Sequence, residues 1–410
     1  MPVKEILIIA FVSLRTNKLR SSLTILGIVV GIFSIIAMGT VVTMLQSTIE
    51  EGVSVFGKNT FQIQKFPAVR TGGPSEWAKL RNRKDISLDD FNRLKEKFVE
   101  AKAVAASANM NGLIVKYKNY KTNPNISLAG VTPEAFITRD WTVEKGRALN
   151  QLDFERYSKN VVLGFDLAKT VFKDLDPIGQ QVSIDGNKLT VIGVLEYEGE
   201  IFGQSRGNFA IIPLTTFHSI YGINKRSLNI SVMAYDRNSY NDLMEKAEGY
   251  MRTIRKIPPG GDNDFDLVSS ESILGQINSI TSGVRIGALV IAAISLLAAG
   301  VGIMNIMLVS VTERTKEIGI RKSIGAKRKN ILVQFLIEAI VLCLVGGVIG
   351  IVAGIMVGNL AGTLLNANMV IPIDWIVIGI SLCVAIGVGF GTYPAYKAAN
   401  LDPIEALRYE

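Results

Sequence analysis

Histidine and cysteine are almost absent from this chain. Its 410 residues include one histidine, His218, and two cysteines. A single histidine cannot build an H-E-x-x-H zinc site or a histidine-based catalytic triad with its supporting residues. Both cysteines, Cys343 and Cys383, stand inside long apolar runs, where cysteine packs as a small hydrophobic residue rather than in a disulfide framework. We therefore expect no enzymatic activity, no catalytic residues and no metal or cofactor bound by this chain.

A nucleotide-binding loop is also missing, although one segment comes near to the pattern. Residues 52–59 read GVSVFGKN, whereas a phosphate-binding loop requires G-x-x-x-x-G-K followed by serine or threonine. Asn59 stands where the hydroxyl that binds Mg²⁺ should be. The segment also follows an apolar run and not a β-strand. We predict that it binds no nucleotide.

Positive charge is concentrated in two short segments. The net charge is +8, but residues 47–285 carry 31 basic and 28 acidic side chains and are close to neutral. Such a balanced domain offers no basic surface for nucleic acid, and we expect no nucleic-acid partner. The excess lies between Lys4 and Arg20 and between Arg314 and Lys329. Both segments flank apolar runs, as the cytoplasmic flanks of membrane spans do.

Long uncharged runs make the chain too apolar for an ordinary soluble protein. Hydrophobic residues form 48% of the sequence, and the mean hydropathy is +0.31. A run of about 20 apolar residues crosses a hydrocarbon core of roughly 30 Å, and no run here alternates as a barrel strand does. The qualifying runs are Leu23–Leu45, Ile286–Val311, Ala339–Leu365 and Trp375–Ala395. We predict four transmembrane α-helices, at residues 21–46, 284–311, 331–365 and 373–397.

The basic segments also predict the orientation of the spans. Because Lys and Arg collect on the cytoplasmic side, we expect the N-terminus, the loop 312–330 and the tail 398–410 inside the cell. Residues 47–283 then form a large extracytoplasmic domain. The first residues have the apolar core of a signal peptide, but no small-x-small cleavage pattern follows. We expect residues 1–20 to form an interfacial helix along the cytoplasmic surface instead.

The extracytoplasmic segment has the alternating patterns of a mixed α+β domain. Residues 58–139 and 227–275 each read as a strand–helix–strand unit, with helices expected at Ser87–Phe98 and Tyr240–Arg255. We expect the insertion between them, residues 140–226, to be mainly β, with a tight hairpin turn at Asp185-Gly186. The predicted strands of the insertion are Val161–Leu163, Gln181–Ile184, Leu189–Leu195 and Phe209–Ile212.

Glycines recur at helical spacing inside two of the predicted spans. Small residues four apart let helix backbones approach closely in a membrane, where hydrophobic burial drives no association. The pair in the first span fits packing inside one chain or a dimer interface equally well. For the longer stripe in the third span we favour internal packing. These residues are Gly27 and Gly31 in the first span, and Gly346, Gly350, Gly354, Gly358 and Gly362 in the third.

A single carboxylate, Glu338, stands near the start of the third span. An ionised carboxylate at the bilayer centre costs about 2.5 kcal/mol or more. Near the cytoplasmic interface this cost is smaller, and the basic loop offers Glu338 a partner. Because no second intramembrane acid lines up with it, we expect no proton-relay role.

The most informative segment, Asn305–Ile331, follows the second span. Helical spacing pairs Glu317 with Arg321, and Gly325 offers a helix stop. Taken alone, these features describe an amphipathic cytoplasmic helix with a basic end. They also fit a charge cluster that does nothing except set the topology.

This segment resembles the signature of the MacB/FtsX permease superfamily. Further similarity lies at Arg20–Gly31, Gly146–Leu195 and Pro394–Glu410, so the resemblance covers nearly the whole chain. In that superfamily, a helix after the second span docks on an ABC ATPase. The coupling residues implied here are Thr312, Glu313, Arg314, Glu317, Ile318, Gly319, Ile320, Arg321, Lys322, Ile324, Gly325 and Ala326.

The resemblance implies both a fold and a set of partners. The fold is a membrane protein of four transmembrane α-helices with a large extracytoplasmic α+β domain, built from two porter-like units and a mainly β insertion. Because only about 20 residues precede the first span, the chain is similar to members whose ABC ATPase is a separate subunit that binds ATP and Mg. Such permeases form homodimers in the lipid of the bacterial inner (plasma) membrane. Their further partners are a membrane-fusion adaptor and, in some systems, a TolC-like outer-membrane channel.

Within the superfamily, several outputs compete. We favour export of drugs, peptides or other amphipathic cargo by mechanotransmission, because the external domain is larger than that of FtsX. Lipoprotein release from the membrane and FtsX-like regulation of cell-wall hydrolases are the alternatives. An unrelated class, a membrane-tethered external enzyme, is disfavoured by the missing catalytic set.

Overall fold

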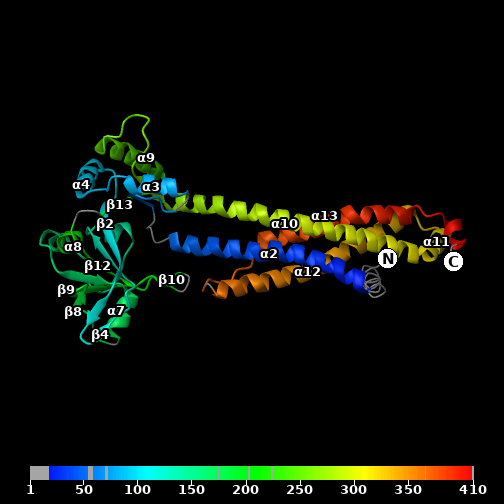
Figure 1. The fold of residues 1–410 in the computed structure, drawn as a ribbon, viewed down its shortest axis with the longest axis horizontal. Coiled ribbons are helices and arrows are strands. Elements are labelled where there is room, and N and C mark those ends of the chain that lie inside the picture. Colours follow the sequence, from blue (N-terminus) through cyan, green and yellow to red (C-terminus); the bar gives the residue numbers. More distant parts are fainter. Residues whose placement is uncertain are drawn as a thin grey trace. The chain divides into compact units, whose positions relative to one another are not determined.

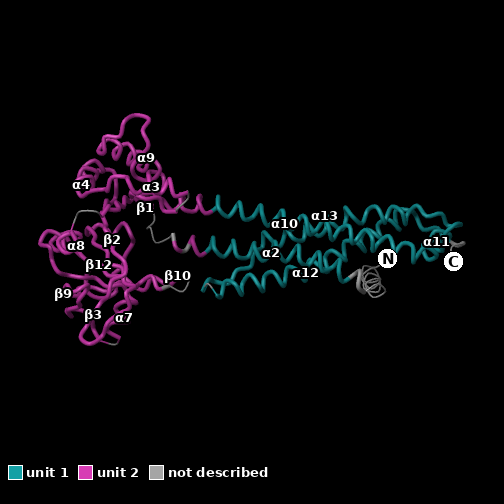
Figure 2. The backbone as a smooth tube through the Cα atoms, viewed as in Figure 1, with its two compact units in different colours: residues 1–47, 278–410 teal, residues 48–277 magenta. Residues whose placement is uncertain are grey.

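The computed structural model describes residues 18–53, 59–69, 73–173, 175–201, 204–222, 226–364 and 366–408. The chain divides into two compact units (Figure 2), one of residues 1–47 and 278–410 and the other of residues 48–277. We call them the membrane unit and the external unit. The interfacial helix predicted at residues 1–20 lies almost wholly outside the described residues, and α2 already begins at Lys18. Most of segment 52–59, which comes near to the phosphate-binding-loop pattern, is outside the described residues as well.

Four long helices dominate the membrane unit, and Figure 1 shows them running alongside one another. Each contains a stretch long and apolar enough to cross a membrane, which confirms the four predicted spans. Two short helices, α11 (Thr315–Ser323) and α14 (Pro403–Arg408), accompany them. The long helices are α2 (Lys18–Val53), α10 (Ser270–Glu313), α12 (Arg328–Leu364) and α13 (Ile373–Ala399).

Helix α10 is much longer than the span predicted from hydropathy. It has 44 residues, which at 1.5 Å per residue extend for about 66 Å, twice the thickness of a hydrocarbon core. The predicted start of the span, residue 284, lies inside α10, and so does the predicted end of the second porter-like unit, residue 275. Hydropathy could not locate the true start, because residues 270–285 mix polar and apolar side chains. The first two turns of α10 belong to the external unit.

The external unit is built on one mixed sheet of 12 strands. The strands follow the order β14-β1-β13-β2-β5-β12-β7-β9-β8-β3-β4, with β6 paired to β9, and β10 and β11 form a separate hairpin. The strands of the two expected porter-like units are β1 (Thr60–Gln64), β2 (Ala103–Leu113), β3 (Val115–Tyr117), β4 (Tyr120–Lys121), β5 (Ile126–Val131), β13 (Asn229–Met233) and β14 (Asp266–Ser269). Those of the insertion are β6 (Val143–Gly146), β7 (Asn160–Leu163), β8 (Gln181–Ile184), β9 (Asn187–Leu195), β10 (Glu200–Ile201), β11 (Gln204–Ser205) and β12 (Phe209–Pro213).

The strands predicted in the insertion are confirmed, but they do not form a sheet of their own. Strand β12 pairs in parallel with β5, so the insertion continues the sheet of the flanking segments. The hairpin turn at Asp185-Gly186 is also confirmed, with φ of 48° and 84° at its two residues. Such paired positive φ angles are those of the type I′ turn that joins adjacent antiparallel strands.

Seven helices are described in the external unit up to residue 269. The two predicted helices are confirmed as α4 and α9, and Ser87 and Asp90 form the capping box that starts α4. The other five helices were not predicted, because each is too short for a periodic pattern to stand out. The helices are α3 (Pro74–Asn82), α4 (Leu88–Lys97), α5 (Ala135–Thr138), α6 (Gln151–Glu155), α7 (Phe165–Phe172), α8 (Leu214–Tyr221) and α9 (Arg237–Ile254).

Both faces of the sheet carry an apolar core, because alternate residues along a strand point to opposite faces. On β12, Ala210 and Ile212 join the larger core, while Ile211 between them joins the smaller one. Strand β5 divides in the same way, with Leu128 in the larger core and Ala129 in the smaller. The smaller core ends part-way along these strands, and polar side chains replace it there.

Candidate functional site

The predicted coupling segment forms a separate helix, α11, which begins directly after α10. The break between the two helices is at Arg314 (φ −100°, ψ 13°). The hydroxyl of Thr315 donates to the carbonyl oxygens of Val311 at 3.0 Å and Thr312 at 2.8 Å. Such back-bonding competes with the regular helix ladder and commonly bends a helix. The sequence therefore ends the long span and starts α11 within one turn.

The end of α11 is fixed by Gly325, as the sequence analysis predicts. Gly325 has a φ of +101°, in the region that side chains with a Cβ rarely adopt. Its N–H donates to the Lys322 carbonyl at 3.0 Å, and the N–H of Ala326 donates to the Arg321 carbonyl at 3.0 Å. These two bonds form the glycine cap that closes many helices.

One side of α11 packs against other helices of the membrane unit. Ile318 is buried with 2% of its surface exposed. The Lys322 ammonium donates to the carbonyl oxygens of Ala399 and Leu401, each at 2.6 Å. Burial, together with the positive charge of Arg328, lowers the pKa of Lys322, and Asp402 opposes this shift. Lys322 thereby joins α11 to the end of α13.

Ion pairs and hydrogen bonds tie α11 and its flanks to α12. Arg321 donates to the Gln334 side-chain oxygen at 3.0 Å and also pairs with Glu317, as its spacing predicts. Arg314 lies 3.3 Å from the carboxylate of Glu338, which is 1% exposed. The expectation that the basic loop supplies a partner for Glu338 is confirmed.

The opposite side of α11 is open and carries an apolar pair. Ile320 and Ile324 are four residues apart, and 46% and 82% of their surfaces are exposed. Charged side chains, Lys316 and Glu317, flank this pair. The predicted coupling residues thus divide into two groups. Thr312, Glu313, Glu317, Ile320, Ile324 and Gly325 are exposed, whereas Arg314, Ile318, Gly319, Arg321, Lys322 and Ala326 are buried or half-buried.

Several residues of this site were not among those predicted from the sequence. Lys316 belongs to the open face, and its helical spacing to Glu313 and Ile320 could have placed it there. Gln334, Ala399 and Leu401 contact the packed side of α11 from distant parts of the chain. No local sequence pattern predicts such contacts, because Ala399 and Leu401 take part only through their backbone carbonyl groups.

The glycines of both stripes pack against other helices of the same chain. A Cβ atom at Gly354 would come within 2.8 Å of the Cβ of Ile36 on α2, and one at Gly350 within 2.9 Å of the Val29 carbonyl oxygen. Gly27 faces Ala299 of α10 in the same way. The glycines of the third span therefore pack against another helix of the same chain. The further members of the stripes, Gly31, Gly346, Gly358 and Gly362, also contact neighbouring helices of the same chain.

In the part of the chain that the structure describes, no group of three or more His, Cys, Asp or Glu side chains is arranged to hold a metal ion. The described residues of α11 offer an exposed apolar pair, Ile320 and Ile324, flanked by the charged side chains of Lys316 and Glu317.

Comparison with known proteins gives two family matches along the chain. Residues 21–250 match the model described as the MacB-like periplasmic core domain, and residues 289–403 match the FtsX-like permease C-terminal model. The macrolide export ATP-binding/permease protein MacB of Bdellovibrio bacteriovorus is 34% identical over 402 residues, which cover 98% of this chain and 61% of that protein. The protein of the same name from Neisseria meningitidis is 37% identical over 396 residues, covering 95% and 58%. This chain spans about three fifths of the length of these relatives.

Among solved structures, the periplasmic region of MacB from Actinobacillus actinomycetemcomitans aligns with 56% of this chain and 97% of its own length. The identity is 21% and the TM-score is 0.45. The extracellular domain of the transporter YknZ from Gram-positive bacteria aligns with 51% of this chain at 21% identity, with a TM-score of 0.41.

Proposed function

The chain belongs to the family of MacB-like permeases, and on that premise we propose that it is the permease subunit of an ATP-driven export complex of the MacB type. An ABC-type ATPase, in a partner subunit or a fused domain, binds ATP and Mg and changes shape as ATP is hydrolysed. The permease passes this motion to its external unit, which expels drugs, peptides or other amphipathic cargo. Relatives that are named macrolide export proteins support export over other outputs.

The observation that carries the proposal is the two-sided character of α11. Its inner side is fixed by Ile318 and by the two hydrogen bonds of Lys322. Its outer side presents Ile320 and Ile324 to solvent. An exposed apolar pair four residues apart is the pattern by which a helix anchors in the groove of a partner protein. A push on the outer side would be passed directly to α10, α12 and α13.

The distribution of charge supports a cytoplasmic position for α11. Positively charged residues collect on the cytoplasmic side of spans, and Lys327, Arg328 and Lys329 directly follow α11. ATP is available on that side. In this orientation both chain termini are cytoplasmic, and the external unit lies beyond the inner (plasma) membrane, where an adaptor and a TolC-like channel would contact it.

A second copy of the chain completes the proposed complex. Helix α10 carries a row of exposed apolar residues three or four positions apart, which places them along one side of the helix. The row faces either lipid or the same helix of a second permease. Its members are Ile286, Val290, Ile294, Leu297 and Val301.

Co-purification tests the proposed docking surface. We would purify the tagged chain from membranes with its ABC-type ATPase and compare wild type with Ile324→Asp. A carboxylate in an apolar groove loses its hydration without gaining a partner, so we expect at least a tenfold loss of bound ATPase. The matched control is Val99→Asp, because Val99 is 86% exposed in the external unit. ATPase recovery at the wild-type level with Ile324→Asp would contradict the proposal.

A further inference from the structure

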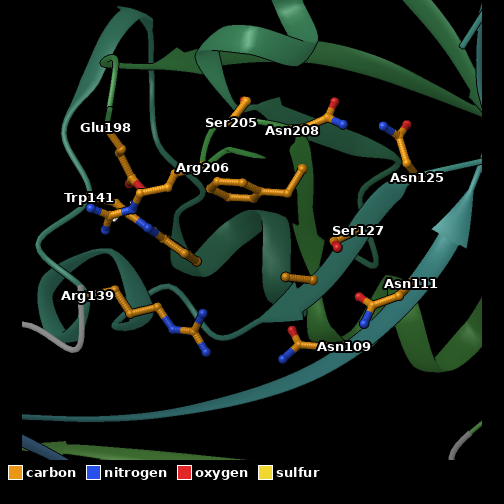
Figure 3. Close-up of a pocket in the computed structure, with 12 residues that line it drawn as sticks. Asn109, Asn111, Asn125, Ser127, Arg139, Trp141, Glu198, Ser205, Arg206 and Asn208 are labelled. Atoms are coloured by element: carbon orange, nitrogen blue, oxygen red, sulfur yellow. Dashed lines mark ion pairs between the residues drawn. The ribbon is translucent and has the colours of Figure 1, made fainter. Parts of the chain in front are cut away.

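A large cavity opens on one face of the sheet in the external unit (Figure 3). Its volume is about 830 Å³, within the range of about 300–1,000 Å³ that small-molecule pockets occupy. Strands β2 and β5 and the start of β12 form its floor, while the turn after α5 and the residues Glu198, Ser205 and Arg206 form its walls. Every residue that lines it belongs to the external unit.

The floor of the cavity continues the smaller apolar core with polar side chains. Along β2, Ala105 belongs to that core, Ser107 follows on the same face, and Asn109 and Asn111 line the cavity. Asn109 lies opposite Ala129 of β5 in the sheet register. Apolar side chains at these positions would extend the core. The sequence instead places carboxamides there, each able to donate and to accept hydrogen bonds.

Arg139 supplies the cavity with a positive charge that is incompletely satisfied. Its guanidinium lies over the indole of Trp141, 5.0 Å from the ring centroid. Its Nη2 donates to the hydroxyl of Ser107 at 3.1 Å, but its Nε is buried and has no hydrogen-bond partner among the described residues. Burial lowers the pKa of Arg139, and the negative charge of Glu198 opposes that shift. A buried donor without a partner destabilises the folded state, and a ligand that accepts a hydrogen bond from it would remove that cost.

The facing wall holds a second guanidinium and one carboxylate. Arg206 and Glu198 approach to 3.9 Å, which is longer than a hydrogen bond. Burial raises the pKa of Glu198, and the charges of Arg206 and Arg139 oppose this. Two guanidinium groups and one carboxylate give the cavity a net positive charge, which favours an anion.

We propose that this cavity binds a small polar ligand that carries an oxyanion, either a carboxylate or a phosphate. The oxyanion accepts hydrogen bonds from Arg139 and Arg206, since a guanidinium matches the geometry of both groups. The carboxamides of Asn109 and Asn208 bind amide or hydroxyl groups on the rest of the ligand. The proposal concerns the external unit and does not depend on the coupling of the membrane unit to an ATPase.

Calorimetric titration of the full chain in detergent micelles tests the proposal and separates the two sources of the oxyanion. The probes are N-acetyl-tetraglycine with a free carboxylate, its C-terminal amide, and inorganic phosphate. We expect the free carboxylate or phosphate to bind saturably with a dissociation constant below about 1 mM. The amide lacks the oxyanion and is expected to bind at least tenfold more weakly than the carboxylate if the carboxylate is the preferred group.

Variants connect the binding to the cavity. Arg139→Gln removes the charge and is expected to weaken binding at least tenfold, whereas Arg139→Lys keeps the charge and should lose less. Arg206→Gln carries the test if Arg139→Gln does not fold. The matched control is Arg93→Gln on α4, whose side chain is 56% exposed and does not line the cavity. If neither oxyanion probe binds wild type saturably, or if both cavity variants bind as wild type does, the proposal is overturned.

Discussion

In the external unit the sheet buries large side chains, whereas in the membrane unit a stripe of glycines on α12 packs against α2. Phe61 and Phe217 are fully buried in the larger core of the sheet. In the bundle, Gly350 and Gly354 of α12 bring their backbone against α2. Water around the external unit drives apolar side chains together. Lipid is as apolar as the side chains themselves, so helices in a membrane gain stability from close contact instead.

We therefore expect the core of the sheet and the glycine stripe of the bundle to be sensitive to different kinds of change. Removing volume should harm the sheet most, because a buried side chain loses both its transfer free energy and its packing contacts. Adding volume should harm the bundle at the glycine stripe, because a Cβ at Gly350 or Gly354 would come within 2.9 Å of α2.

The largest expected effect is the loss of volume in the external unit. Phe217 is fully buried and packs on Gly130. Phe217→Ala should lower the free energy of unfolding of this unit by about 3–5 kcal/mol, measured by urea titration with tryptophan fluorescence. The control Phe66→Ala changes a side chain that is 38% exposed and should cost much less. Equal losses in the two variants would contradict the proposed role of burial.

A smaller loss is expected from added volume in the membrane unit. Gly354→Leu would push α12 away from Ile36 of α2, and overpacking of this kind costs about 1–3 kcal/mol. The thermal unfolding midpoint in detergent should therefore fall. The matched control is Gly389→Leu, because a Cβ at Gly389 meets no atom within 4 Å. If both variants unfold at the same temperature, close contact at the stripe is not what holds α12 to α2.

The smallest effect concerns charge in the external unit. Burial alone would raise the pKa of Asp153, but hydrogen bonds from Arg147, the Asn150 backbone and Asn160 lower it overall. The folded state therefore favours the carboxylate. Its stabilisation is present above the ordinary pKa of an aspartate and is lost as the pH falls through the lowered folded-state pKa.

Because the Arg147 side chain is 48% exposed, solvent screens the pair, and we expect about 1 kcal/mol at pH 7. Unfolding midpoints of wild type and Asp153→Asn, measured from pH 7 to pH 2, check this. The two curves should differ at pH 7 and converge at the acid end. A difference that is constant with pH would show that the carboxylate charge contributes nothing.

The sequence predicts the four spans well but does not predict how far α10 extends beyond its span. Four apolar runs identify the four spanning helices, because lipid admits few charged residues over that length. The start of α10 at Ser270 could not be found in this way. Its first turns are amphipathic and lie in the external unit, where hydropathy gives no signal.

The candidate site is also only partly predictable from the sequence. Local spacing predicts the Glu317–Arg321 pair and the stop at Gly325, and both are confirmed. The anchoring of Lys322 on carbonyl groups at the end of α13 depends on tertiary contact. Only the structure separates exposed Ile320 from buried Ile318, although both are part of the same motif.

The central claim is that α11 couples an ATPase to motion of the external unit. A spin label on Val99→Cys in each of the two permease copies of one complex would report that motion directly. The measured quantity is the distance between the two labels. Selective labelling is feasible because the native Cys343 and Cys383 are buried. We predict that ATP changes the distance between the labels in the parent complex and leaves it unchanged when Ile324→Asp is added. A full ATP-dependent change in the Ile324→Asp complex would contradict the claim that α11 is the coupling element.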